Sequence, residues 1–222
     1  MKKILVLAVH PDDETLGCGG TILRHKEEND EVDWLIVTNI TEKNGFKKEI
    51  VQNRQDEIDI VNKLYNFNSI TKLNLPTIKL DELTSGEVIG KISQVIKNIK
   101  PEVIYLQYRG DAHSDHLIVF DAVMTCSKSF RYPYVKEIYA METLSETEFS
   151  APLIQNAFIP NHFVDISKYI DKKIEIMKVY KSELQEHPFP RSERNIRALA
   201  TLRGAYAGVD SAEAFMCLKS IR

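Results

Sequence analysis

The sequence predicts a three-layer α/β fold in which a mostly parallel sheet lies between two layers of helices. Short apolar segments alternate with amphipathic ones through the first two thirds of the chain, and this order is typical of a parallel sheet covered on both faces. Two of the apolar segments end abruptly in polar clusters, at 10–14 and 109–116. Because ligands of open parallel sheets bind beyond the carboxyl ends of the strands, the same fold predicts where a site would lie.

The strands are predicted from short apolar segments. Residues 3–9 and the segment "VIYLQY" are apolar on both faces, as expected for strands that are buried on both sides. The last third of the chain is less regular, and its two strands are the weaker predictions. In chain order, the expected strands cover residues 3–9, 32–38, 70–75, 103–108, 137–143 and 162–166.

The helices are predicted from apolar residues at helical spacing. Residues 87–99 are the clearest case, since their apolar positions form one stripe that ends before Pro101. Ser167 is a possible N-cap for a helix over 167–184. The segment "HPFPRS" at 187–192 is expected to be a loop because its prolines exclude regular structure. The expected helices cover residues 21–28, 47–64, 87–99, 115–129, 167–184 and 195–205.

Composition narrows the class of protein. The 222 residues suit a single domain, 43% are hydrophobic and 27% charged, and the net charge of −3 gives no basic excess that would favour nucleic acid. The first apolar run is too short to span a membrane. Three widely spaced cysteines make a disulfide framework unfavourable. We therefore expect a cytoplasmic protein without a membrane span or a nucleic-acid partner.

The two polar clusters are expected to meet on one edge of the sheet, because each follows a parallel strand. Carboxylates gathered there would repel one another, and a divalent cation would relieve that repulsion. Two imidazoles and one carboxylate suit Zn²⁺ with a fourth position open, although another first-row metal fits the same ligands. The expected cluster comprises His10, Asp12, Asp13, Glu14, Asp111, His113, Asp115 and His116.

Spacing within each cluster suggests a division of labour. Asp12 and Asp13 are adjacent, so one is expected to bind the metal and the other to lie beside the bound water as a general base. His113 and His116 are three residues apart, so one could bind metal while the other faces the substrate. The glycines of "GCGG" do not follow the dinucleotide-binding spacing, and a tight turn with close helix packing is the favoured role.

Two motifs carry a resemblance to a known family. "AVHPDDETLGCGGTI" followed by "HSDH" resembles the LmbE-like, or PIG-L, family of zinc-dependent N-deacetylases. The C-terminal segments "PFPRS" and "RGAYAGVDSAEAF" are similar to the ends of many members, so the resemblance extends over the whole chain. It implies a Rossmann-like fold and removal of an acetyl group from an N-acetylated sugar or glycoside. Members often form higher oligomers, so a homo-oligomer is a further expectation.

The resemblance also implies residue roles. His10, Asp13 and His116 would bind zinc, Asp12 would be the general base, and His113, supported by Asp115, would stabilise the oxyanion. Arg54 would hold substrate hydroxyls. From their place at the strand tip, Arg109 and Asp111 are candidates for substrate contacts, with a local salt bridge as the alternative. From its position alone, Glu14 is expected to support a metal ligand. Arg191 could contact a phosphate or a neighbouring subunit, but solvation at the surface is the favoured interpretation.

These observations favour hydrolysis of an acetamide on an amino sugar, with acetate and a free amine as products. The segment "YRGDA" is more similar to members associated with surface polysaccharides than to the bacillithiol branch. Two alternatives stay open: a deacetylase of a thiol glycoside, and a metal-binding protein without catalytic activity. A dinucleotide-dependent enzyme is disfavoured because the acidic cluster would repel a pyrophosphate.

Overall fold

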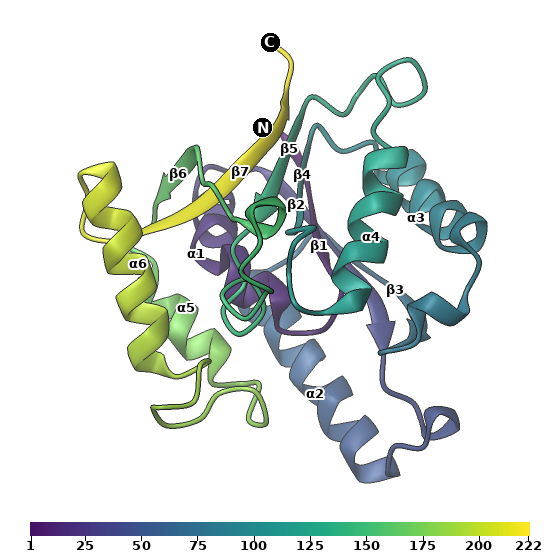
Figure 1. Cartoon of the computed structure of the whole chain (residues 1–222), viewed down its shortest axis with the longest axis horizontal. Coiled ribbons are helices and arrows are strands. Elements are labelled where there is room, and N and C mark those ends of the chain that lie inside the picture. Colours follow the sequence, from purple (N-terminus) through teal and green to yellow (C-terminus); the bar gives the residue numbers. More distant parts are fainter.

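A seven-stranded sheet forms the centre of the computed structural model, which describes residues 1–222. Its strands are β1 (Lys3–Ala8), β2 (Glu31–Asn39), β3 (Ser69–Pro76), β4 (Val103–Gln107), β5 (Glu137–Met141), β6 (His162–Asp165) and β7 (Ala212–Ser220). The strand order is β3-β2-β1-β4-β5-β7-β6 (Figure 1). The first five strands are parallel, and β7 runs antiparallel to β5 and β6. The predicted fold class is confirmed.

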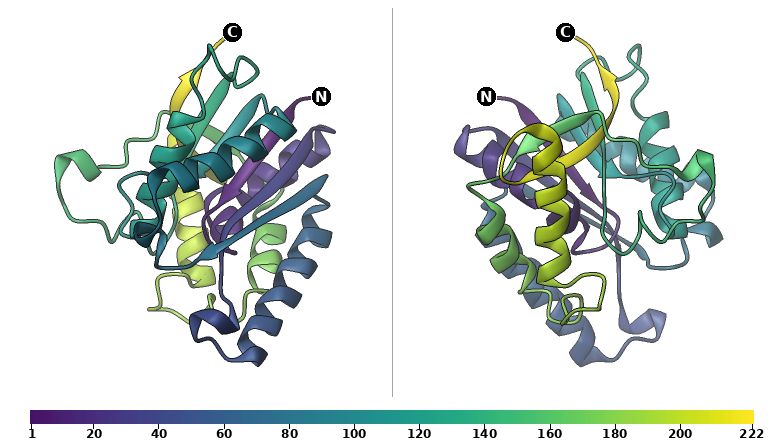
Figure 2. Two further views of the ribbon diagram at one scale, coloured as in Figure 1. Left: turned by 90° about the vertical axis from the view of Figure 1, so that its right-hand side faces the viewer. Right: turned by 60° about the vertical axis from the view of Figure 1, so that its left-hand side comes forward.

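Helices cover both faces of this sheet, as Figures 1 and 2 show. One layer contains α1 (Asp13–Glu27), α2 (Lys48–Tyr65), α5 (Ile170–Met177) and α6 (Glu193–Ala207), and the other contains α3 (Ser85–Ile99) and α4 (Ser114–Thr125). Short 3-10 turns lie at Glu42–Asn44, Leu80–Glu82 and Ile154–Asn156. None of the helices is long and apolar enough to cross a membrane.

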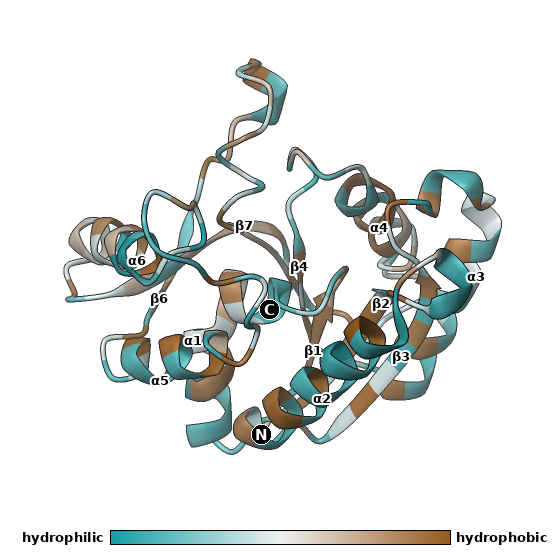
Figure 3. Ribbon diagram, turned by 90° about the horizontal axis from the view of Figure 1, so that it is seen from below, coloured by the Kyte–Doolittle hydropathy of each residue, from teal (hydrophilic) through white to brown (hydrophobic).

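The strand β1 explains how both layers are held. Its alternate residues Ile4 and Val6 belong to the apolar core under α1, α2, α5 and α6, whereas Leu5 and Leu7 belong to the core under α3 and α4. Side chains of a strand alternate between the two faces, so a run that is apolar at every position must be buried on both. The helices in Figure 3 correspondingly combine brown, apolar stripes with teal, polar ones.

The helix α1 begins eight residues earlier than the sequence prediction, which placed its start at residue 21. The glycine cluster therefore lies inside the helix, in a part interrupted by non-helical backbone at Cys18. A Cβ at Gly17 would lie 2.8 Å from the Met141 side chain, and one at Gly20 would lie 2.6 Å from Ile166. The expected close packing is confirmed, but the expected tight turn is wrong, because none of these three glycines has a positive φ.

Other differences lie in the last third of the chain. The prediction missed β7, which pairs with two strands distant in sequence and has no clean alternation of apolar and polar residues. The expected helix over 167–184 is present only as α5. At its start, the Ser167 hydroxyl donates to Asp165 Oδ1 (2.6 Å) instead of capping a helix. The helix α4 ends at Thr125, four residues before the predicted end. The helix α6 begins at a Ser192 cap, whose side chain accepts from the Asn195 N–H.

The sheet order also places the site. Strands β1 and β4 are neighbours, although α1, α2 and α3 with two strands lie between them in the chain. The order of connection reverses at this pair, and such a switch point opens a crevice at the carboxyl ends of the strands. The two polar clusters follow these two strands, so they meet at this crevice.

Candidate active site

The turn between β1 and α1 holds the first polar cluster in a fixed and unusual conformation. Asp12 has φ of 128°, a region that residues with a side chain rarely adopt. Its N–H donates to Glu14 Oε2 (3.1 Å), and its carbonyl accepts from the Leu16 N–H (2.9 Å). Glu14 is fully buried and also accepts from Thr15 and from the Tyr180 hydroxyl. Glu14 thus supports the backbone of Asp12 directly and contacts no predicted metal-ligand side chain.

The turn between β4 and α4 holds the second cluster. His113 is the N-cap of α4, and its Nδ1 accepts from the Asp115 N–H (3.1 Å). Since Nδ1 is the acceptor, the proton of a neutral His113 lies on Nε2. His116 lies in the first helical turn and is fully buried. Three histidine rings converge here, with the His113 centroid 4.2 Å from that of His10.

Three side chains from these turns form a candidate metal site. Asp13 Oδ2 lies 3.7 Å from His10 Nδ1 and 3.4 Å from His116 Nε2. His116 Nε2 is buried and has no hydrogen-bond partner, which is costly unless another group binds there. A carboxylate with two imidazoles is a common ligand set for catalytic zinc. The three residues present therefore fit a divalent first-row cation.

Two further carboxylates contact the ring nitrogens of the candidate histidine ligands that face away from the metal site. Asp111 Oδ2 lies 2.8 Å from His116 Nδ1, and Asp115 Oδ2 lies 3.3 Å from His10 Nε2. Such pairs fix the tautomer and orientation of a metal-binding imidazole. In both rings the other nitrogen, His10 Nδ1 or His116 Nε2, faces Asp13.

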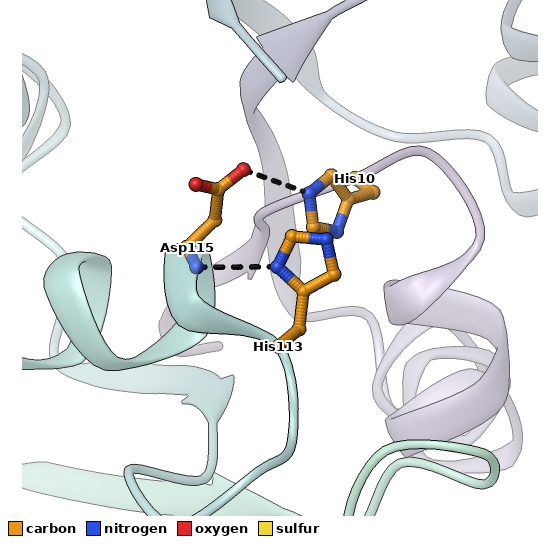
Figure 4. A group of neighbouring side chains, drawn as sticks. All are labelled: His10, His113 and Asp115. Atoms are coloured by element: carbon orange, nitrogen blue, oxygen red, sulfur yellow. Dashed lines mark hydrogen bonds and ion pairs between the residues drawn. The ribbon is translucent and has the colours of Figure 1, made fainter. Parts of the chain in front are cut away.

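Asp115 differs from its predicted role. Its carboxylate contacts His10 and accepts from the N–H of Ile78 (2.7 Å), while only its backbone N–H reaches His113 (Figure 4). The donor atoms of His10, His113 and Asp115 also lie close together. In that second group, however, His113 Nδ1 already accepts from a backbone N–H, whereas His116 Nε2 has no hydrogen-bond partner, so the group with His116 is the better metal site.

Burial and neighbouring charges shift the pKa values of these groups. Burial opposes the charged form of Asp13, but the adjacent His116 and His10 outweigh it and lower the pKa of Asp13 to about 2. Burial, followed by the neighbouring His10 and His116, lowers the pKa of His113 to about 4, so His113 is neutral near pH 7. Burial, followed by Asp13 and Glu183, raises the pKa of Asp12. A carboxylate with a raised pKa is a stronger general base than a solvated one.

A cavity of about 310 Å³ opens beside the candidate metal site. Asp12 lies at its wall and is 4% exposed, so its carboxylate is shielded from bulk water. The cavity is lined by His10, Pro11, Asp12, Asp13, Thr38, Asn39, Ile40, Arg54, Thr77, Ile78, His113, Glu146, Glu183 and Arg191.

Two arginines and a glutamate form one side of this cavity. Arg54 donates to the Pro11 carbonyl (3.0 Å) and pairs with Glu183. Arg191 reaches Asp12 Oδ2 (3.2 Å) and Glu183 Oε2 (3.1 Å). Glu183 therefore links the two arginines, and Arg191 connects them to the predicted general base.

The other predicted substrate contacts lie elsewhere. Arg109 pairs with Asp121 (2.8 Å) on the exposed surface, and Asp111 is buried against His116. Neither lines the cavity. The structure thus places Arg109 in a local salt bridge, although with Asp121 rather than with Asp111.

Three charged residues of the cavity wall were missed from the sequence. Arg191 was expected at the surface, and Glu146 and Glu183 were not singled out. The loop of Arg191 comes from the far end of the chain, and only the segment "PFPRS" pointed to it. Glu146 and Glu183 lie in irregular segments whose path depends on tertiary packing, so no local pattern could identify them.

Comparisons with known proteins identify the family of this chain. The family model described as "PIG-L: GlcNAc-PI de-N-acetylase" matches residues 5–127. A diacetylchitobiose deacetylase from Thermococcus kodakarensis is 24% identical over 222 residues, covering 96% of this chain and 82% of that protein. A probable N-acetyl-alpha-D-glucosaminyl L-malate deacetylase 2 from Bacillus anthracis is 21% identical, covering 82% and 81%.

A solved structure extends the agreement to the whole fold. The conserved protein TT1542 from Thermus thermophilus superposes with a TM-score of 0.79 at 25% identity, covering 100% of this chain and 97% of that one. Fold, site and relatives together define a hydrolase of the N-deacetylase class, with a candidate metal centre at the switch point of its sheet. The chain belongs to the PIG-L, or LmbE-like, family, whose match begins in β1 and includes both polar clusters.

Proposed function

We propose that this protein is a zinc-dependent deacetylase that removes the acetyl group from an N-acetylated amino sugar or its conjugate. The observation that carries the proposal is the buried, unpartnered Nε2 of His116 beside Asp13 and His10, next to a cavity whose wall includes His10, Asp12 and Asp13. The set combines ligands for a metal with a separate carboxylate, which is the minimum that metal-assisted amide hydrolysis requires.

His10, Asp13 and His116 would hold the metal through Nδ1, Oδ2 and Nε2. When bound, zinc supplies a Lewis acid that polarises the acetyl carbonyl and lowers the pKa of water. The carboxylates of Asp111 and Asp115 keep the two imidazoles in the orientation that binding needs.

Asp12 takes the proton from the attacking water and later delivers it to the departing amine. Its raised pKa suits both transfers. His113 is neutral and carries its proton on Nε2, so it donates a hydrogen bond to the oxygen that becomes negative in the transition state. Arg54, on the cavity wall beside Pro11, is the contact that we assign to substrate hydroxyls.

The proposal is tested by measuring released acetate and free amine from a panel of substrates. The panel comprises N-acetylated monosaccharides, oligosaccharides, and sugars linked to nucleotide, malate or thiol groups. Enzyme loaded with zinc is compared with enzyme that has been stripped by a chelator and then reloaded with zinc, iron or manganese. We expect turnover on at least one N-acetyl sugar, its loss after stripping, and its return with zinc.

Two results would contradict the proposal. Turnover that survives complete metal removal would exclude the metal-assisted mechanism. An absence of acetate from every substrate, with zinc bound, would favour the alternative of a metal-binding protein without catalysis. A clear preference for thiol-linked sugars would favour the thiol-glycoside alternative over surface-polysaccharide biosynthesis, the context that we propose from the segment before "HSDH".

A further inference from the structure

We propose that the cavity selects N-acetylated glycans that carry no anionic group next to the reacting sugar, and that Glu146 enforces this selection. This inference rests on the proposed deacetylase function and specifies its substrate class. It is carried by three features of the cavity: a carboxylate without a partner, two arginines that are already paired, and a wall with few apolar side chains.

Glu146 is fixed in place by its backbone. Its N–H donates to the Thr143 carbonyl (3.1 Å), and its carbonyl accepts from the N–H of Ala112 (3.0 Å). The preceding Ser145 has φ of 73°, and its N–H donates to Glu148 Oε1 (2.7 Å). Ala112 lies in the turn that carries the second polar cluster, so these bonds tie Glu146 to the metal-site turn.

The Glu146 side chain has no partner of its own. It is half-buried, lines the cavity with His10 and Asp13, and makes no hydrogen bond or ion pair within the chain. Every other carboxylate on the cavity wall has a positively charged or hydrogen-bonding neighbour, as the pairs of Asp12 and Glu183 illustrate. A half-buried carboxylate without a partner is available to accept hydrogen bonds from a ligand.

Apart from the proposed metal, no positively charged side chain of the cavity wall is free to neutralise an anionic ligand. Arg54 pairs with Glu183 and with Glu57 (3.4 Å), and Arg191 pairs with Asp12 and Glu183. The cavity wall contains no lysine. A phosphate or carboxylate on the substrate would have to break one of these pairs and would also face the charge of Glu146, and like charges at an interface strongly disfavour a partner.

Few large apolar side chains line the uncharged part of the wall. Ile40 and Ile78 are the only aliphatic side chains on it apart from Pro11, and no Phe, Tyr or Trp lines it. The side chains of Asn39 and Thr77, together with Glu146, offer hydrogen-bond donors and acceptors to a hydroxylated ring. At about 310 Å³ the cavity is at the small end of ligand sites, which suits one sugar ring rather than a lipid-bearing conjugate.

The inferred charge selection fits the substrate named for one relative but not the substrate named for another. A neutral N-acetylated disaccharide, the substrate named for the Thermococcus relative, fits these features, and an L-malate glycoside, named for the Bacillus relative, does not. A partly deacetylated oligosaccharide would also fit, because Glu146 could pair with its ammonium group.

The experiment compares three N-acetylglucosamine derivatives that differ only in the group on the anomeric oxygen: methyl, phosphate and L-malate. Zinc-loaded wild-type enzyme should show a kcat/KM for the methyl glycoside at least about tenfold above those for the two anions, equivalent to about 1.4 kcal/mol. Glu146→Gln should reduce this ratio several-fold, and Glu146→Lys should reverse it. Glu148→Gln removes the same charge two residues away but keeps an acceptor for the Ser145 N–H, so it should leave the ratio unchanged.

The wild-type ratio alone can overturn the inference, even if a variant fails to fold. Equal rates on all three compounds, or a preference for an anion, would contradict the charge selection while leaving the deacetylase function intact. Unchanged selectivity in folded Glu146→Lys would show that Glu146 is not responsible. If none of the compounds, nor any other N-acetyl sugar, releases acetate, the proposed function itself fails, and the inference with it.

Discussion

At the scale of single residues, some side chains of the site could be predicted from the sequence and others could not. His10, Asp12 and Asp13 directly follow a buried strand, and His113 and His116 follow its neighbour, so strand-tip placement was enough to bring them together. Arg191 approaches Asp12 from a loop 179 residues away, and such a contact has no local signature. The structure also gives Glu14 a role, because its carboxylate accepts a hydrogen bond from the backbone N–H of Asp12, which has a positive φ.

The predicted division between ligand and base is tested by Asp12→Asn. The amide keeps the size of the side chain and leaves His10, Asp13 and His116 untouched, but it cannot accept a proton from water. We expect zinc content equal to wild type and a fall in kcat of roughly 10²-fold or more, the usual contribution of a general base. Metal analysis and acetate release measure the two quantities. Loss of zinc together with activity would instead identify Asp12 as a ligand.

Asp30, far from the site, gives a prediction for the pH dependence of stability. Asp30 accepts from the Lys2 N–H (2.6 Å) and contacts His25 Nδ1 (2.9 Å). Burial opposes its charge, but these hydrogen bonds and the charge of His25 lower its pKa below the usual value. A lowered pKa stabilises the fold above the pKa of the unfolded state, and this stability is lost as the pH falls through the folded-state pKa.

We therefore expect Asp30→Asn to reduce the free energy of unfolding at pH 7, with a difference from wild type that shrinks below about pH 4, near the usual pKa of aspartate. Urea unfolding at a series of pH values measures this difference. The exposed Asp81, in a 3-10 turn, supplies a control, since Asp81→Asn should have little effect at any pH. A difference for Asp30→Asn that grew with acidity would contradict the assigned pKa direction.

At the scale of elements, the interrupted helix α1 shows how the first cluster is held. The backbone is non-helical at Cys18, and a buried ion pair supplies partners around this break. Glu213 accepts from the N–H groups of Gly20 (2.9 Å) and Thr21 (2.7 Å), and Lys173 donates to the Leu16 carbonyl (2.9 Å). The glycine pattern indicated close packing, but these partners lie in α5 and β7. Only the tertiary fold explains why the break is tolerated.

The ion pair at this break gives an element-scale prediction. Lys173 and Glu213 are 4% and 5% exposed, with Nζ and Oε1 2.7 Å apart. Glu213→Gln would leave the ammonium group buried without a counter-charge, and removing one partner of a buried pair costs about 3–5 kcal/mol. Urea unfolding should detect this loss. As a control, Glu28→Gln breaks the exposed pair with Arg24 and should cost at most about 1 kcal/mol. A cost for Glu213→Gln as small as the control's would mean that Lys173 finds another partner.

At the scale of the whole molecule, the fold class and the meeting of the two clusters followed from the order of apolar and amphipathic segments. The antiparallel β7 did not, because its pairing with β5 and β6 depends on contacts between segments far apart in the chain. The candidate metal site joins the turn after β1, the start of α1 and the first turn of α4, so it links the two layers of helices at the carboxyl ends of the central strands. Metal binding at such a junction should stabilise the entire fold.

This coupling gives the last prediction. A ligand that binds only the folded state at 100 times its Kd adds about 2.7 kcal/mol of stability, and a chain of this size gains roughly 2–4 °C in Tm per kcal/mol. Zinc-loaded protein should therefore melt about 5–10 °C above metal-stripped protein in thermal scans.

His116→Ala should abolish the zinc-dependent shift, because it removes a buried ligand. The exposed His187 provides the matched control, and His187→Ala should retain the shift in full. A shift that persisted in folded His116→Ala would place the metal elsewhere, with the group of His10, His113 and Asp115 as the next site to examine.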